Sequence, residues 1–388
     1  MVSEEDFREK EIALERYRAA QVQGISMAFA AWSKDGKTSS GPIELKTSDD
    51  FILSEYLSKI RALRRKGRCL HFDAGTRCTE WVDAHSIQKS GALSLIAQNG
   101  IVYVVSKNFS DTKRTKGRTA FTKQGVGTVS TFRGFCGEHD NEVFEPIDNF
   151  PLEPNAEQIT LYAYRSLCRE VFFKENSVAL FRDLLDSQPN NKANRAVFEA
   201  MLDGSTFALK NLTAQKAKYD FMLQSKSFDR IRSILFHSTQ APAVVFSGVL
   251  YPDYDFFGNR LQDLSDQSAE RDLISFSFAP MSRGWGVLFA WESDSSSSCV
   301  PLFRSLATVV HDGASLGDSL FRFVVSNCEN VALSPVWWES LNENQRADVA
   351  KFANHGADIF TPIRSDYLVK GLENISGWEF DYVDPNFE

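Results

Sequence analysis

The sequence predicts an α+β protein with a small metal-binding module near its start, a helical middle and a C-terminal α+β domain with a mainly antiparallel sheet. Three observations support this class. Short-spaced cysteine and histidine pairs occur early in the chain, as in small folds stabilised by a metal ion. Apolar residues recur at helical spacing through much of residues 155–236. Runs of β-branched and aromatic residues alternate with helical patterns after residue 243, which is typical of α+β domains.

Two elements are expected before the metal-binding segment. Residues 4–21 carry apolar side chains at helical spacing, and residues 25–32 are short and mostly apolar, as in a strand. After a polar, glycine-containing break, the polar residues 48–50 can cap a second helix over 51–63. This helix would lead a run of cations toward Cys69.

Short elements of different types alternate within residues 66–150. We expect a strand over 80–85, helical turns over 91–98, a strand over 101–106 and a loop over 108–127. A short helix over 136–145 is expected to stop at Pro146, because proline lacks the N–H that continues the helical hydrogen bonds.

The remainder of the chain divides into a helical region and a C-terminal domain. Residues 155–236 are expected to be mainly helical. Beyond them, strands are expected over 243–251, 273–279 and 285–291, and helices over 301–310, 315–326 and 337–354. The predicted units are therefore residues 1–50, 51–150, 151–236 and 237–388.

The composition is that of a folded protein that does not span a membrane. Hydrophobic residues make up 43% and charged residues 24% of the chain, as in globular domains. No apolar run is long enough for a membrane helix, and Met1 is followed by acidic residues rather than by a secretory signal. Six scattered cysteines without an export signal favour free thiols, so we expect a cytoplasmic protein with no membrane partner.

Four residues form the strongest candidate site: Cys69, Cys78, Cys136 and His139. The first two flank a tight turn, and the last two have the spacing Cys-x-x-His before a segment of helical composition. Zinc accepts four nitrogen and sulfur ligands in a tetrahedron, and short-spaced pairs supply them in small folds. In a treble-clef zinc fold the second pair opens a helix, whose positive end favours thiolate. The sequence therefore predicts a structural Zn²⁺ in a treble-clef-like module, with His71 as an alternative to Cys69.

The predicted module is basic although the chain as a whole is acidic. Residues 51–133 contain 15 Lys and Arg against 5 Asp and Glu, while the whole chain has a net charge of −8. A local positive field attracts phosphates whatever the overall charge, although a solvated helix face would account for either cationic run alone. The residues expected to contact nucleic acid are Arg64, Arg65, Lys66, Arg68, Lys113, Arg114, Lys116 and Arg118.

Two segments resemble parts of the HNH, or ββα-metal, endonucleases. Residues 83–88, Asp-Ala-His-Ser-Ile-Gln, are similar to the histidine motif on that family's hairpin. Residues 136–141, Cys-Gly-Glu-His-Asp-Asn, are similar to its closing knuckle and helix. The same segments also resemble those of uncharacterised bacterial proteins that pair Ala-His-Ser-Ile-Gln with Gly-Phe-Cys-x-x-His-Asp.

The resemblance implies metal-assisted hydrolysis of a phosphodiester. His85 would be the general base, with an ordinary pKa of about 6.5 that suits neutral pH. Asp140, with Asp83 or Asn141, would hold a divalent ion such as Mg²⁺ or Mn²⁺ that stabilises charge on the phosphate. The family has an acid directly before its base, where this chain has Ala84, and Asp140 stands near the position of its final histidine.

The expected function is therefore that of a zinc-containing, nucleic-acid-binding protein. The more specific hypothesis, which the HNH resemblance implies, is a metal-dependent nuclease. The alternative is a non-catalytic structural zinc module in a protein-interaction or sensing protein, whose C-terminal domain contacts a protein partner. No Walker loop or Gly-x-Ser-x-Gly elbow is present, so the sequence does not support P-loop or serine-hydrolase chemistry.

Overall fold

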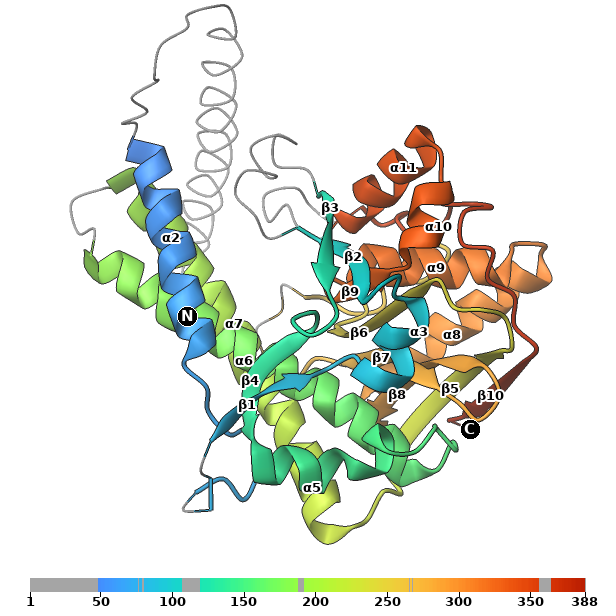
Figure 1. Ribbon diagram of the computed structural model, residues 1–388, viewed down its shortest axis with the longest axis horizontal. Coiled ribbons are helices and arrows are strands. Elements are labelled where there is room, and N and C mark those ends of the chain that lie inside the picture. Colours follow the sequence, from blue (N-terminus) through green and yellow to red (C-terminus); the bar gives the residue numbers. More distant parts are fainter. Residues whose placement is uncertain are drawn as a thin grey trace, which may run out of the picture.

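The computed structural model describes residues 48–387 except 76, 79, 107–118, 188–191, 265, 267 and 356–363. This part of the chain is an α+β fold with two antiparallel sheets, which confirms the predicted class (Figure 1). The helix predicted over 4–21 and the strand predicted over 25–32 lie outside the described residues. Within the described ranges, no helix is long and apolar enough to cross a membrane.

An eight-stranded sheet forms the centre of the described fold. Its order is β10-β5-β8-β7-β6-β9-β2-β3, and every neighbouring pair is antiparallel. The strands are β2 (Ile101–Val105), β3 (Phe121–Gly125), β5 (Ile231–Ser238), β6 (Val244–Leu250), β7 (Ile274–Pro280), β8 (Trp285–Glu292), β9 (Val331–Leu333) and β10 (Tyr382–Asn386). Because β2 pairs with β9, this sheet combines strands of the predicted 51–150 module with strands of the C-terminal region.

Helices cover both faces of the sheet. The helix α6 (Ala156–Ser187) packs on β5 to β8 from one side, and α8 (Ser296–His311) and α9 (Leu316–Asn327) pack from the other. Successive side chains of β8 alternate between the two cores: Leu288 faces α6, whereas the ring of Phe289 meets Phe303 and Phe323. Burial on both faces explains why these strands read as continuous apolar runs.

Three helices form an arm that extends from the sheet (Figure 1). They are α2 (Ser48–Arg65), the outer part of α6, and α7 (Lys192–Ser225), which runs back along α6. Ile60 of α2 joins a small apolar cluster with Leu180, Leu184 and Phe198. This packing places the cationic C-terminal end of α2 next to the middle of α6, where Arg64 lies over the ring of Phe173.

A separate two-stranded sheet carries the metal-ligand candidates. It pairs β1 (Trp81–His85) with β4 (Thr131–Cys136), and α5 (Gly137–Asp148) follows β4 directly. The register shifts between Val82 and Ala84, so Asp83 faces two residues of β4, Arg133 and Gly134. Such a bulge bends a strand and re-aims its side chains. Between β1 and β2 lie two short helical segments, η1 (Lys89–Leu93) and α3 (Ser94–Ile96).

Two predicted element boundaries near the metal-ligand candidates are wrong. Pro146 lies inside α5, which continues to Asp148, because a proline in the last turn removes one hydrogen bond without preventing the turn. The segment predicted as a loop over 108–127 contains strand β3, whose residues Phe121 to Gly125 pair with β2. Its polar sequence suits an edge strand, which has solvent on one side.

Two further predictions fail in the C-terminal half. The predicted helical region ends at Ser225, and Ile231–Ser238 is the buried strand β5. The helix predicted over 337–354 is two helices, α10 (Pro335–Ser340) and α11 (Glu343–Ala353). The break occurs because Asn342 accepts a hydrogen bond from the backbone of Gln345 and starts a new helix with a capping box.

Asn330 joins the small sheet to the large one. This buried residue precedes β9, and its side-chain amide donates to Ser86 Oγ at 2.9 Å and to Ser247 Oγ at 2.9 Å. Ser86 in turn bonds Ser130 Oγ at 2.7 Å. The Ala-His-Ser-Ile-Gln segment therefore contributes hydrogen bonds that fix the position of the metal-ligand module on the sheet.

Candidate functional site

Four side chains meet beside the small sheet and could hold a metal ion: Cys69, Cys78, Cys136 and His139. Their ligand atoms all lie within 4.8 Å of one another. The three sulfur atoms lie 3.4, 3.5 and 3.3 Å from His139 Nδ1, in that order. These are the residues that the sequence predicted as a ligand set.

The second pair is positioned by the start of α5. Cys136 ends β4 and is the N-cap of the helix, and its sulfur accepts a hydrogen bond from the backbone N–H of His139 at 3.5 Å. The partial positive charge of a helix N-terminus stabilises a thiolate there. Both side chains are 0% exposed. The Cys-x-x-His spacing brings the two ligands together because it spans about one helical turn.

The first pair lies on the segment that leads to β1. Leu70 donates its backbone N–H to Gly134 O at 2.8 Å, which holds Cys69 beside β4. Burial raises the pKa of the Cys69 thiol to about 11. His71, the alternative ligand, is not part of the group: its ring stacks on His139 at 4.1 Å, and its Nδ1 accepts from the N–H of Asp73.

A polar network covers the outer side of this cluster. Arg77 Nη2 lies 2.9 Å from His139 Nε2 and 3.0 Å from a carboxylate oxygen of Asp73. The same guanidinium is 3.3 Å from Glu138 and 3.7 Å from Glu142. Three carboxylates around one arginine keep the polar outer surface of the cluster in a defined arrangement.

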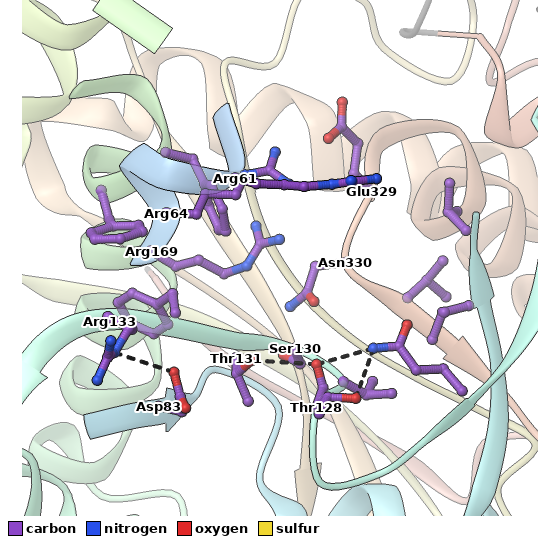
Figure 2. A pocket seen from close by; sticks show the side chains of 18 of the residues that line it. Arg61, Arg64, Asp83, Thr128, Ser130, Thr131, Arg133, Arg169, Glu329 and Asn330 are labelled. Carbon is purple, nitrogen blue, oxygen red and sulfur yellow. Dashed lines mark hydrogen bonds and ion pairs between the residues drawn. The ribbon is translucent and has the colours of Figure 1, made fainter. Parts of the chain in front are cut away.

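A pocket of about 570 Å³ lies where α2, the small sheet, α6 and the large sheet meet (Figure 2). Five arginines line it, against two carboxylates, Asp83 and Glu329. The arginines are Arg61, Arg64, Arg65, Arg133 and Arg169. Figure 2 shows Arg61, Arg64 and Arg169 on the helical side, with Asn330 and Ser130 opposite them. We call this feature the arginine pocket.

Two arginines of the pocket are fixed by the surrounding fold. Arg133 donates to Arg65 O at 2.9 Å and to Trp81 O at 3.1 Å, and its Nε lies 3.5 Å from Asp83. Arg169 is 7% exposed, its guanidinium lies 4.6 Å from the centre of the Phe173 ring, and it pairs with Glu170. The Nε of Arg169 has no hydrogen-bond partner among the described residues.

The residues predicted to contact nucleic acid have different locations. Arg64 and Arg65 line the arginine pocket, whereas Lys66 is exposed and does not line it. Arg68 is held against α6, with its guanidinium 4.4 Å from the Phe172 ring and paired with Glu175. The predicted contacts at Lys113, Arg114, Lys116 and Arg118 lie outside the described residues.

The three catalytic candidates also have different surroundings. Asp83 lines the arginine pocket beside Arg133. His85 is half-buried, its Nε2 lies 3.3 Å from Val126 O, and burial lowers its pKa. Burial raises the pKa of Asp140 to about 6, and one of its carboxylate oxygens has no hydrogen-bond partner among the described residues. Neither His85 nor Asp140 is among the residues that line the pocket.

Several residues of the arginine pocket were not among the sequence-predicted site residues, including Arg61, Arg133, Arg169 and Asn330. Arg169 could have been noticed in the sequence, because a charged residue there interrupts the buried apolar face of a long helix. Arg133 stands three residues before the ligand Cys136, on a strand of otherwise apolar and small residues. Asn330 gave no signal, because its role depends on partners far away in the sequence.

Comparisons of the chain with protein-family models, with curated proteins and with solved structures found no match. The class of protein is therefore defined by its fold and its candidate site alone: an α+β protein with a Cys₃His cluster beside an arginine-lined pocket.

Proposed function

We propose that this protein binds nucleic acid through the arginine pocket, on a module that a zinc ion stabilises. The observation that carries the proposal is the convergence of five arginines from α2, β4 and α6 on one cavity with two carboxylates. The proposal places the protein in the cytoplasm, where thiolate ligands remain reduced.

Zinc suits the Cys₃His cluster by ligand type and by size. With Zn–S of about 2.3 Å and Zn–N of about 2.0–2.1 Å, a tetrahedral ion separates sulfur from nitrogen by about 3.5–3.6 Å. The three measured sulfur–nitrogen distances are 3.3 to 3.5 Å. A ligand pair that opens α5 directly after strand β4 supports a treble-clef-like module. Four protein ligands leave no open position, which is typical of a structural site.

Phosphate is the ligand that the arginine pocket suits best. A guanidinium binds two phosphate oxygens with parallel hydrogen bonds, and it stays charged at any physiological pH. Asp83 is already engaged by Arg133, and Arg169 is paired with Glu170. Five arginines against these two carboxylates and Glu329 still leave a net positive charge for a ligand. Contacts of this kind fix the backbone of a nucleic acid without reading its sequence.

The central test compares two double variants in a binding assay. We expect Arg61→Gln with Arg65→Gln to weaken binding of a labelled single-stranded oligonucleotide by about tenfold or more at moderate salt. The slope of log K against log salt concentration should fall in magnitude by about 1.4, that is, about 0.7 for each phosphate that the variant no longer neutralises. Both residues are exposed on α2, and glutamine has a helix propensity close to that of arginine.

The matched control is Arg304→Gln with Lys351→Gln, which removes the same charge from exposed positions of α8 and α11 outside the pocket. It should leave the affinity within about twofold of the wild type. Equal reductions of affinity in both variants would show that only the overall charge matters, and the pocket would not have the role proposed for it.

A second variant separates binding from hydrolysis. His85→Ala should change oligonucleotide affinity by less than about twofold, because the imidazole faces Val126 O and does not line the arginine pocket. The same samples are incubated with Mg²⁺ or Mn²⁺ and the strand length is measured. We expect binding without cleavage. If the wild type cleaves the strand and His85→Ala does not, the protein is not a binding protein alone, and HNH-like hydrolysis with His85 as general base is supported.

A further inference from the structure

The arginine pocket has exposed cations and a buried one. Arg61 and Arg65 are exposed, whereas Arg169 and Asn330 are each 7% exposed. Figure 2 shows Arg169 reaching from α6 into the space between the helical side and Asn330. A ligand must therefore enter past the exposed arginines before it reaches the guanidinium of Arg169.

The size of the pocket restricts what can enter. Its volume of about 570 Å³ lies within the ~300–1,000 Å³ of sites that enclose a single small ligand. A double helix is too wide for such a cavity, and the middle of a strand would have to fold back on itself inside it. A chain end or a free nucleotide can enter without such distortion.

The charge of the pocket restricts the ligand further. An internal phosphodiester carries one negative charge, whereas a terminal phosphomonoester carries about −1.5 to −2 at pH 7 and has three acceptor oxygens. The Phe173 ring packs against Arg169 at 4.6 Å and against Arg64 at 5.0 Å, so two guanidinium groups are held in place by one ring. Preorganised cations of this kind favour the more highly charged group.

We propose that the arginine pocket binds the phosphorylated end of a single-stranded nucleic acid, with Arg169 contacting the terminal phosphate and Arg61 and Arg65 contacting the phosphodiesters behind it. This proposal rests on the proposed function and narrows it from nucleic acid in general to strand ends. A free nucleotide carries the same terminal phosphate, so the experiment includes it as a separate arm.

The experiment uses the full chain and fluorescence anisotropy. The probes are one short single-stranded oligonucleotide with a phosphate at its 5′ end, at its 3′ end or at neither, labelled internally. A nucleoside triphosphate and inorganic pyrophosphate serve as unlabelled competitors. We expect one phosphorylated form to bind about tenfold more tightly than the form without a terminal phosphate. This comparison needs no variant, so it does not depend on whether a substituted protein folds.

Two variants assign the preference to a residue. Arg169→Met retains the apolar packing on Phe173 and removes the cation, so it should abolish the preference: the affinity for the phosphorylated strand should fall about tenfold further than the affinity for the unphosphorylated strand. Arg169→Lys should restore part of the preference, since a lysine supplies charge but not the planar pair of donors. A merely structural role for Arg169 would weaken all three strands alike.

The outcomes separate this proposal from the function on which it rests. Equal binding of all three strands would overturn the proposal and leave nucleic-acid binding intact. If no strand binds but the triphosphate binds when it is titrated directly in a calorimeter, nucleic-acid binding is refuted and the terminal-phosphate site is assigned to a nucleotide. If neither strands nor nucleotides bind, both proposals fail.

Discussion

Replacing Cys136 by alanine is expected to abolish metal binding and to lower the free energy of unfolding by about 3–5 kcal/mol. Cys136 supplies one of the four clustered ligand atoms and also caps α5. The substitution leaves three ligands and removes the cap at the same time. Metal content is measured by mass spectrometry of the purified protein, and stability by denaturant titration.

The control is Cys299→Ala, which also removes a 0% exposed cysteine from the first turn of a helix, here α8. Cys299 is not part of the metal-ligand cluster, so one metal ion should remain bound and stability should fall by only about 1 kcal/mol. Similar destabilisation of the two variants, with no metal found in the wild type, would refute the zinc site.

Removing the metal is expected to weaken binding at the arginine pocket by about tenfold or more. Both sites depend on β4, which carries Cys136 at its end and Arg133 three residues earlier. The segment that carries Cys69 bonds β4 through Arg68 N to Arg133 O at 3.0 Å. Without the ion this segment is no longer attached at Cys69, and the hydrogen bond from Arg133 to Arg65 O at the end of α2 is no longer supported.

The test treats the protein with a chelator, removes the complex and measures oligonucleotide affinity before and after Zn²⁺ is returned. Circular dichroism recorded at each step shows whether the large sheet and the long helices persist. Recovery with Zn²⁺ at unchanged secondary structure would support local coupling between the two sites. Unaltered affinity in the metal-free protein would show that the pocket does not depend on the cluster.

The metal-ligand cluster could be predicted because its strongest pair is local. Cys136 and His139 belong to one helical turn, and the composition of the residues after them is enough to predict the helix. The choice between Cys69 and His71 was not local. The sequence left both open, and it is the hydrogen bonds of that segment to β4 that bring Cys69 into the cluster and place His71 in a ring stack on His139.

Strands were predicted where apolar runs are long and misassigned where tertiary pairing overrides composition. The runs that form β6, β7 and β8 are buried on both faces and need no context to be recognised. The polar strand β3 is held by its pairing with β2, and β5 follows a long helix without a strong punctuating residue. Both depend on partners in other parts of the chain.

The sequence by itself determined the α+β class, the positions of most helices and the ligand pair Cys136 and His139, since each depends on residues within a few turns of one another. Only the tertiary structure decided the arginine pocket. Its walls come from residues 61–65, 83, 104–105, 124–133, 169–173 and 329–331, which no local pattern relates. Packing of α2 against α6, the bulge at Asp83 and the bonds of Asn330 bring them together. A charge pattern read along the chain shows where cations are, but burial and approach in space decide which of them share a ligand.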